Sequence, residues 1–339
     1  MNCRRILITA VSILTCLTGL PRPTTAAAAG SSVRSNAGSA AGPEEAAGPS
    51  GAGRLSVVCT SFPGYDFARQ ILGDSGDVTM LLRPGAESHT YEPTPQDILT
   101  IQKCDLFVYT GGDSDEWVRD VLLSVQPSSI KVFRMMDCVK LAEEPHSEGM
   151  EEDWEEEDEG SPEMDEHVWT SPANAMEIIR SMESAIVSLD PDRKEFYASQ
   201  AEAYLSQIVS LDRQFREIVR NAACTEIIVA DRFPFRYFCD EYGLTYYAAF
   251  PGCSTDTQPS AKTVAFLIDQ VKKDRIPMIF HIELSSSGEQ MCRSIAEATG
   301  ARVGLLHAVH NVSLRDFEQG ATYVSLMQHN AAVLKEALQ

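Results

Sequence analysis

The sequence of 339 residues lacks the short motifs that identify many enzymes and cofactor-binding proteins. It contains no GxxxxGKS/T phosphate loop, no GxGxxG behind a β-rich run, no GxSxG nucleophile elbow and no HExxH zinc motif. CxxC is also absent, which argues against a zinc ribbon or a thioredoxin-like redox site. These absences weigh against nucleotide hydrolysis, dinucleotide chemistry and serine hydrolysis.

Positive charge is scarce. The chain has 28 Lys and Arg residues against 49 Asp and Glu residues, which gives a net charge of −21. Affinity for nucleic acid or for anionic lipid in general needs excess positive charge, so we expect no nucleic-acid partner. Residues 143–166 hold 14 of the acidic residues and no Lys or Arg, and the rest of the chain is only mildly acidic.

A long, uncharged and mostly apolar run lies near the N-terminus. Residues 6–20 follow Arg4 and Arg5 and precede small residues at 24–29, which is the layout of a secretory signal. The run is too short for a comfortable membrane span. We therefore expect residues 1–27 to be a signal peptide or lipoprotein leader, with an uncleaved anchor as the alternative.

The segment behind the leader predicts how the folded body is tethered. Cys16 follows Ile-Leu-Thr, which loosely resembles a lipobox, so a lipid anchor through Cys16 is an open alternative to free export. Residues 28–54 contain almost no large apolar side chain and are expected to form a disordered tether. The sequence thus predicts an exported protein at the cell surface or in the periplasm.

Cysteine usage gives no clear disulfide framework. Seven of the nine cysteines lie beyond the leader, an odd number, so at least one thiol is unpaired or pairs elsewhere. Most of the seven sit in apolar runs and are expected to be small core residues.

The remaining sequence alternates β-rich runs with helical periodicity, and 44% of the chain is hydrophobic. The β-rich runs are 55–60, 78–82, 106–109, 130–134, 226–230, 245–250, 278–283 and 303–306. Such alternation is typical of an α/β fold with mostly parallel sheets. We expect two α/β lobes, at 55–190 (with an acidic loop at 143–166) and at 223–339, joined by one long backbone helix at 191–222.

Three histidines occur where an α/β protein commonly places its ligands. His89 follows the second β-rich run, His167 precedes a helix, and His310 follows a run of the second lobe. Neutral imidazoles that converge from both lobes would suit Zn²⁺. The histidines lie far apart in sequence and form no local metal motif, so for each one a surface or core imidazole with a satisfied hydrogen bond remains the alternative.

Four segments carry motifs of one known family. They are Gly-Ala-Glu-Ser-His-Thr-Tyr-Glu-Pro-Thr-Pro at 85–95, Asp-Glu-His-Val-Trp-Thr-Ser-Pro at 165–172, Arg-Tyr-Phe with Tyr-Gly-Leu at 236–244, and Tyr-Val-Ser-Leu-Met at 323–327 with Asn330. Over residues 55–339 the chain resembles the solute-binding proteins of bacterial metal ABC transporters, in the zinc- and manganese-uptake cluster. The resemblance implies a metal bound in the cleft between the two lobes.

The resemblance also implies a set of ligands. His89 and His167 match the first two ligands of the family, and His310 falls one residue off the position of a family Asp or Glu. The third ligand of the family falls on Arg232, which has no lone pair for a cation. The fourth donor is therefore expected to be water, Asp231 or Glu283.

By this resemblance the protein is not an enzyme but an extracytoplasmic binding protein for a divalent transition metal. Three imidazoles favour zinc, with manganese or iron as alternative cargo. It would act, as a monomer, with the membrane permease of an ABC importer and its cytoplasmic ATPase. A three-histidine zinc hydrolase, with Glu283 or Asp231 as general base, is one rival interpretation. A degenerate adhesin, with Arg232 marking a lost site, is another.

The acidic segment 143–166 lies where zinc-binding relatives of this kind carry a charged, His-rich loop. It contains one histidine, His146, and many carboxylates. It either raises the local concentration of cations at the cleft or is a solvated loop that like charges keep extended. Both interpretations stay open.

Overall fold

A computed structural model of the protein describes residues 53–124, 130–150, 163–254 and 258–339. The predicted leader, Cys16, all but the last two residues of the predicted tether and residues 151–162 of the acidic segment lie outside this part. The described residues form one compact unit. Among the described residues, no helix combines the length and the apolar character that crossing a membrane requires.

The first lobe is built on a four-stranded parallel sheet with the strand order β2-β1-β3-β4. Its strands are β1 (Leu55–Cys59), β2 (Gly76–Met80), β3 (Leu106–Tyr109) and β4 (Lys131–Arg134). Its helices are α1 (Phe62–Leu72), α2 (Pro95–Ile101) and α3 (Trp117–Ser124). Buried β-rich runs are joined here by helical crossovers, because parallel neighbours cannot be joined by short hairpins.

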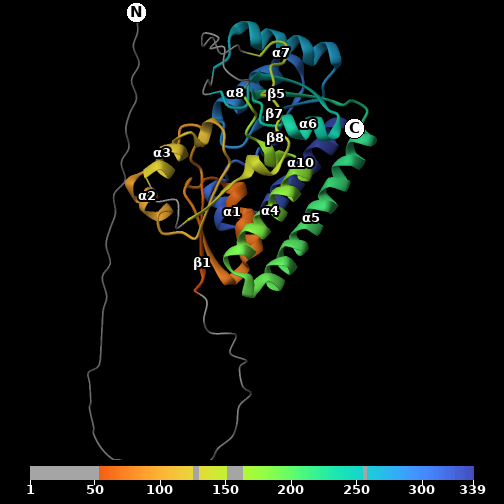
Figure 1. The fold of residues 1–339 in the computed structure, drawn as a ribbon. Helices are drawn as coiled ribbons and strands as arrows, with labels where there is room; N and C mark the ends of the chain where they lie inside the picture. Colours follow the sequence, from red (N-terminus) through yellow and green to blue (C-terminus); the bar gives the residue numbers. More distant parts are fainter. Residues whose placement is uncertain (1–52, 125–129, 151–162, 255–257) are drawn as a thin grey trace, which may run out of the picture. The chain divides into compact units, whose positions relative to one another are not determined.

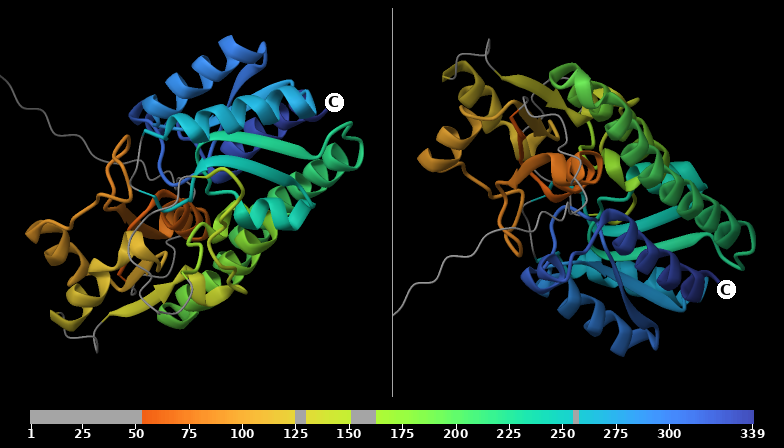
Figure 2. Two further views of the ribbon diagram at one scale, coloured as in Figure 1. Left: turned by 90° about the horizontal axis from the view of Figure 1, so that it is seen from above. Right: turned by 90° about the horizontal axis from the view of Figure 1, so that it is seen from below.

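The second lobe repeats the plan with the strand order β6-β5-β7-β8, again all parallel. Its strands are β5 (Glu226–Arg232), β6 (Thr245–Phe250), β7 (Met278–Ile282) and β8 (Arg302–Leu306). Its helices are α6 (Arg236–Tyr242), α7 (Ala261–Asp274), α8 (Ser286–Thr299), α9 (Leu314–Glu318) and α10 (Tyr323–Leu338). The two sheets with their helices form the two lobes that Figures 1 and 2 show.

Two long helices run beside both lobes. They are α4 (Pro172–Leu189) and α5 (Lys194–Arg220), and a 3-10 turn at Pro191–Arg193 precedes α5. With 27 residues α5 is ~40 Å long. It contains no Gly or Pro, and its buried stripe follows steps of three and four residues and packs on α1, α4 and α10 (Figure 1). This is the predicted linking helix, and it begins about one turn later than predicted.

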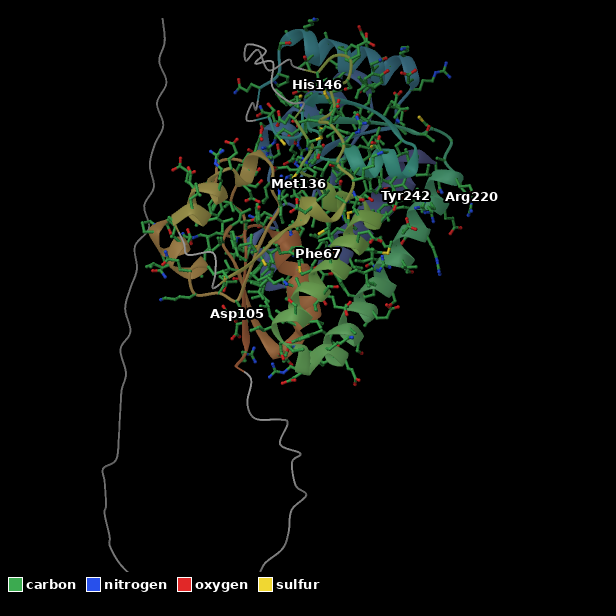
Figure 3. All side chains as sticks on the ribbon, in the orientation of Figure 1. Phe67, Asp105, Met136, His146, Arg220 and Tyr242 are labelled. Carbon is green, nitrogen blue, oxygen red and sulfur yellow. The ribbon has the colours of Figure 1, made fainter. Side chains whose placement is uncertain are left out.

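The hydrophobic core is continuous from one lobe to the other. One cluster of buried side chains includes Val57 of β1, Ile178 of α4, Ile208 of α5, Val229 of β5 and Leu334 of α10. Phe67 on α1, labelled in Figure 3, is fully buried, and its ring centroid lies 5.2 Å from that of Tyr323 on α10. A shared core of this kind resists movement of one lobe against the other.

The predicted fold class, two α/β lobes with parallel sheets joined by one long helix, is confirmed. The predicted ranges of β3 and β6 match the structure residue for residue. The seven cysteines of the described residues are all free thiols, and four of them are buried. The short helix α9 was not predicted, because its five residues are too few to show a helical period.

A buried carboxylate on α1 links this helix to α5 and α10 by hydrogen bonds. Asp66 on α1 is fully buried and accepts hydrogen bonds from Tyr204 Oη on α5 (2.5 Å), Tyr323 N on α10 (2.8 Å) and Arg69 Nε (2.7 Å). Removal of such an acceptor leaves its buried donors unpaired.

We expect Asp66→Ala to lower the free energy of unfolding by about 3 kcal/mol. Urea unfolding followed by circular dichroism measures the change. Asp120→Ala, which removes an exposed carboxylate from α3, is the matched control and should change stability by less than about 0.5 kcal/mol. Equal effects of the two substitutions would contradict the role given to Asp66.

Candidate metal centre

His89 lies in the loop that follows β2. Gly85 has a φ of 84°, in the region that favours glycine, and turns the chain in front of His89. The amide nitrogen of Asn311 donates to the carbonyl oxygens of Arg83 (2.7 Å) and Ala86 (2.9 Å), which ties this loop to the second lobe. Nδ1 of His89 lies 2.9 Å from the Ser114 hydroxyl, so the ring is oriented by a hydrogen bond.

His167 is fully buried just before α4. Its Nδ1 lies 2.8 Å from Asp165 Oδ1, and the same oxygen accepts a hydrogen bond from the His167 backbone N–H (2.7 Å). Burial opposes the charged form of this imidazole, but the carboxylates of Asp165 and Glu166 outweigh it and raise the pKa of His167. A carboxylate behind one ring nitrogen leaves the other nitrogen free to bind a metal, as in many zinc sites.

His310 lies in the loop that follows β8. The preceding Val309 has a φ of 64°, which is uncommon for a β-branched residue. The His310 carbonyl accepts a hydrogen bond from Phe62 N (3.1 Å), and Trp169 Nε1 donates to the Ala308 carbonyl (2.7 Å). Burial, the imidazoles of His167 and His89 and the guanidinium of Arg232 hold the pKa of His310 well below its usual range.

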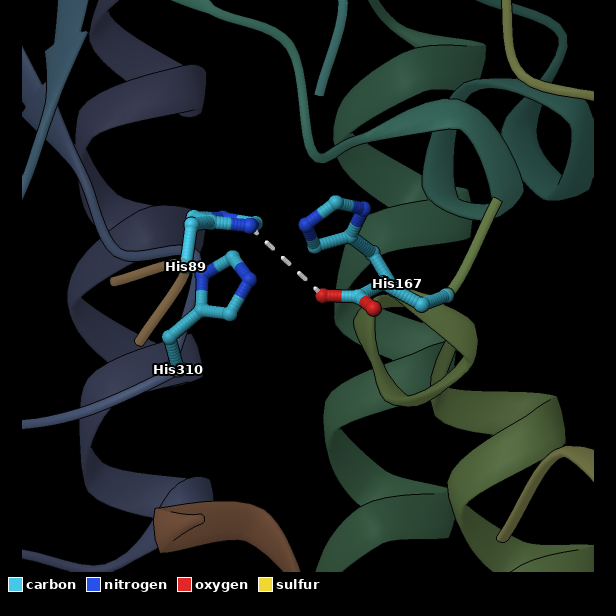
Figure 4. A group of neighbouring side chains, drawn as sticks. His89, His167 and His310 are labelled. Atoms are coloured by element: carbon cyan, nitrogen blue, oxygen red, sulfur yellow. Dashed lines mark ion pairs between the residues drawn. The ribbon is translucent and has the colours of Figure 1, made fainter. Parts of the chain in front are cut away.

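The structure brings the three predicted histidines together (Figure 4). The ring centroid of His310 lies 4.5 Å from that of His167 and 5.3 Å from that of His89, and the His89 and His167 centroids are 6.0 Å apart. Within the described residues, neither His167 Nε2 nor His310 Nε2 has a hydrogen-bond partner, although both are buried. Buried polar atoms without partners are rare and suit a ligand.

Glu166 completes this group and was not predicted as a donor. Each of His89, Glu166, His167 and His310 offers one ligand atom, and all four atoms lie within 4.8 Å of one another. Glu166 is buried, accepts hydrogen bonds from the Ser114 hydroxyl and from Ser114 N (3.1 Å), and has Oε1 3.8 Å from His89 Nδ1, the ion pair dashed in Figure 4. Burial raises the pKa of Glu166 to about 7.

Neither of the predicted carboxylate candidates belongs to the group. Asp231 accepts hydrogen bonds from the backbone N–H of Arg232 (2.9 Å) and of Ile282 (3.2 Å). Glu283 Oε2 accepts one from Ala308 N (2.6 Å) in the loop that carries His310, and burial raises the pKa of Glu283 to about 7. Both carboxylates therefore support backbone that surrounds the centre.

A small cavity borders the centre. A cavity of about 20 Å³ is lined by Ser114, Glu166, Trp169 and His310, among others. Sites for small organic ligands commonly have a few hundred Å³ or more. The cavity beside the candidate ligands is far smaller than such sites.

The fold and the site define a solute-binding protein of the two-lobe class, with a cation-sized centre between the lobes. The particular family follows from the sequence: residues 57–337 match the family described as ZnuA, zinc-uptake complex component A, periplasmic. The chain belongs to this family. The family match confirms the resemblance that the sequence motifs indicated. It also confirms the prediction that the protein is a binding component of a transport system and not an enzyme.

Curated relatives agree with this assignment. The high-affinity zinc uptake system protein ZnuA of Bacillus subtilis is 33% identical over 288 residues, which cover 84% of this chain and 88% of the relative. The zinc-binding lipoprotein AdcA of Streptococcus pneumoniae is 30% identical over 285 residues, or 84% of this chain. The match spans 56% of AdcA, so the rest of AdcA lies outside the aligned region.

Solved structures give the same fold. The metal-dependent lipoprotein YcdH of Bacillus subtilis has a TM-score of 0.71 at 31% identity, over 84% of this chain and 100% of that chain. The Zn(II)-bound ZnuA-like domain of Streptococcus pneumoniae AdcA has a TM-score of 0.70 at 28% identity, over 84% of this chain and 99% of that domain.

The position of Glu166 leads to a test. We expect Glu166→Gln to weaken zinc binding by about tenfold, because the substitution keeps the size of the side chain and removes its anionic donor. Isothermal calorimetry on chelator-stripped protein measures the change. Glu92→Gln, on an exposed residue three positions after His89, is the control and should bind zinc like the unaltered protein. Equal affinity in both variants would remove Glu166 from the ligand set.

Proposed function

We propose that the protein captures a divalent transition metal, preferentially zinc, outside the cytoplasm and delivers it to an ABC importer. His89, His167 and His310 would bind the ion, and Glu166 would supply the fourth donor. One observation carries the proposal: four donor atoms from both lobes converge within 4.8 Å, and two of them are buried imidazole nitrogens without another partner.

The chemistry of the donors supports zinc over manganese. Imidazole nitrogen suits zinc, whereas manganese prefers carboxylate, carbonyl and water oxygens. Three imidazoles and one carboxylate also match the number of ligands in a tetrahedral zinc site. Zinc–nitrogen bonds of ~2.0–2.1 Å imply that the four donors draw closer together when the ion binds.

The family and its relatives support the transport role. The matched family is a component of a zinc-uptake complex, and the Bacillus subtilis relative is named for high-affinity zinc uptake. By this proposal the partner is the membrane permease of an ABC importer with its cytoplasmic ATPase, and the protein acts as a monomer. It would work at the cell surface or in the periplasm, either free or anchored through Cys16.

Binding and release would involve little movement of the lobes. The continuous core and α5 hold the lobes together, so discrimination between ions rests on the type and geometry of the donors. Release would then need a partner that displaces one ligand-bearing loop. The loop of His310 is suited to this, because hydrogen bonds to both lobes hold it in place and a partner could break them.

Elemental analysis of protein purified without added metal tests the cargo, and competition among Zn²⁺, Mn²⁺ and Fe²⁺ ranks the ions. We expect zinc in the purified protein, and we expect His310→Ala to weaken zinc binding by at least about tenfold. His329→Ala removes an exposed imidazole from α10 and serves as the control. Failure of the unaltered protein to bind any of the three ions would refute the proposed function, and an unchanged affinity of His310→Ala would exclude that ligand.

A further inference from the structure

Arg232 forms an ion pair between the two lobes near the centre. It is the last residue of β5, and its guanidinium donates through Nη1 to Glu87 Oε1 (3.2 Å) and through Nη2 to Glu87 Oε2 (2.9 Å). Glu87 lies in the loop after β2, two residues before His89. The side chain of Arg232 is 12% exposed and that of Glu87 is 39% exposed. The pair is bidentate and partly shielded, the strong form of an ion pair.

Glu87 is an oxygen donor held beside the candidate metal centre. Its Oε1 also accepts hydrogen bonds from the backbone N–H of Ser88 (3.0 Å) and of His89 (3.4 Å). Glu87, Arg232 and His310 line one small cavity of about 20 Å³, enough for about one water molecule. A Glu87 carboxylate released from Arg232 would therefore have space next to a candidate ligand.

Acidic side chains surround the guanidinium. The carboxylates of Glu87, Asp231 and Glu283 all attract the charge of Arg232, and of these three Glu87 forms a hydrogen-bonded ion pair with it. Asp231 and Glu283 are engaged with backbone N–H groups, as described above. An Arg side chain has no lone pair, so it contributes nothing to the ion directly and acts through the carboxylate that it binds.

We propose that Arg232 is a specificity-determining residue: it binds the Glu87 carboxylate and withholds it from the ion, so that the centre prefers zinc to manganese. The inference rests on the proposed function. With Glu87 held, the donors are three imidazoles and one carboxylate, a four-coordinate set that suits zinc. A second carboxylate would add oxygen ligands and raise the coordination number, which favours manganese.

A cycle of four proteins tests this inference: the unaltered protein, Arg232→Gln, Glu87→Gln and the double variant. Each is stripped with a chelator, and its Kd values for Zn²⁺ and Mn²⁺ are measured by competition. We expect Arg232→Gln to bind Mn²⁺ at least about tenfold more tightly with a smaller change for Zn²⁺, because it frees Glu87. The double variant should lose this gain. Arg236→Gln removes a charge from the nearby α6 and should keep the original ratio of affinities.

Two results would overturn the inference. An unchanged ratio in Arg232→Gln would mean that Glu87 stays away from the ion without Arg232. A manganese gain that persists in the double variant would mean that Arg232 acts by its own charge. Should Arg232→Gln fail to fold, Glu87→Gln alone still decides: affinities within about threefold of the unaltered protein support the inference, and a tenfold loss of zinc affinity would make Glu87 a ligand and reject it. Failure of the unaltered protein to bind zinc is a separate result, which bears on the proposed function.

Discussion

The candidate centre depends on one buried imidazole, that of His167, in which one ring nitrogen is hydrogen-bonded and the other is not. Nδ1 of His167 lies against the Asp165 carboxylate, and Nε2 faces the other donors without a hydrogen-bond partner among the described residues. A buried polar atom without a partner costs free energy that the rest of the fold must offset. His310 Nε2 shares this situation. By the proposed function, a cation that accepts both lone pairs would remove that cost, so ion binding would stabilise the folded state.

Several groups around the candidate centre fix the positions of these rings. Asp165 orients His167, Ser114 contacts both His89 and Glu166, and Glu283 holds the loop of His310. They lie in three different segments of the chain, and the shared core fixes these segments relative to one another. The fold itself therefore holds the imidazoles close together. Such preorganisation reduces the entropy that binding must overcome.

Much of the fold and part of the centre could be predicted from the sequence. The buried runs at 106–109 and 245–250 predicted β3 and β6, because a short apolar run between polar turns leaves few alternatives. Loops at the carboxyl ends of parallel strands predicted where His89 and His310 would lie. Glu166 was missed because it closes a run of acidic residues and was counted with them. The pairing of Arg232 with Glu87 was missed because 145 positions separate them and no local period connects such residues.

The loop of His310 is the part of the centre where the conformation itself is costly. A φ of 64° at the β-branched Val309 costs ~1–3 kcal/mol, which the contacts of the loop must offset. Those contacts come from both lobes: Glu283 binds Ala308 N from the second lobe, and Phe62 N binds the His310 carbonyl from the first. A membrane partner that broke either contact would let Val309 relax to negative φ and would withdraw His310 from the ion. Three other donors would remain, but a site short of one imidazole holds zinc less tightly. By the proposed function, a small displacement of one loop would thus free the ion while the continuous core stays intact.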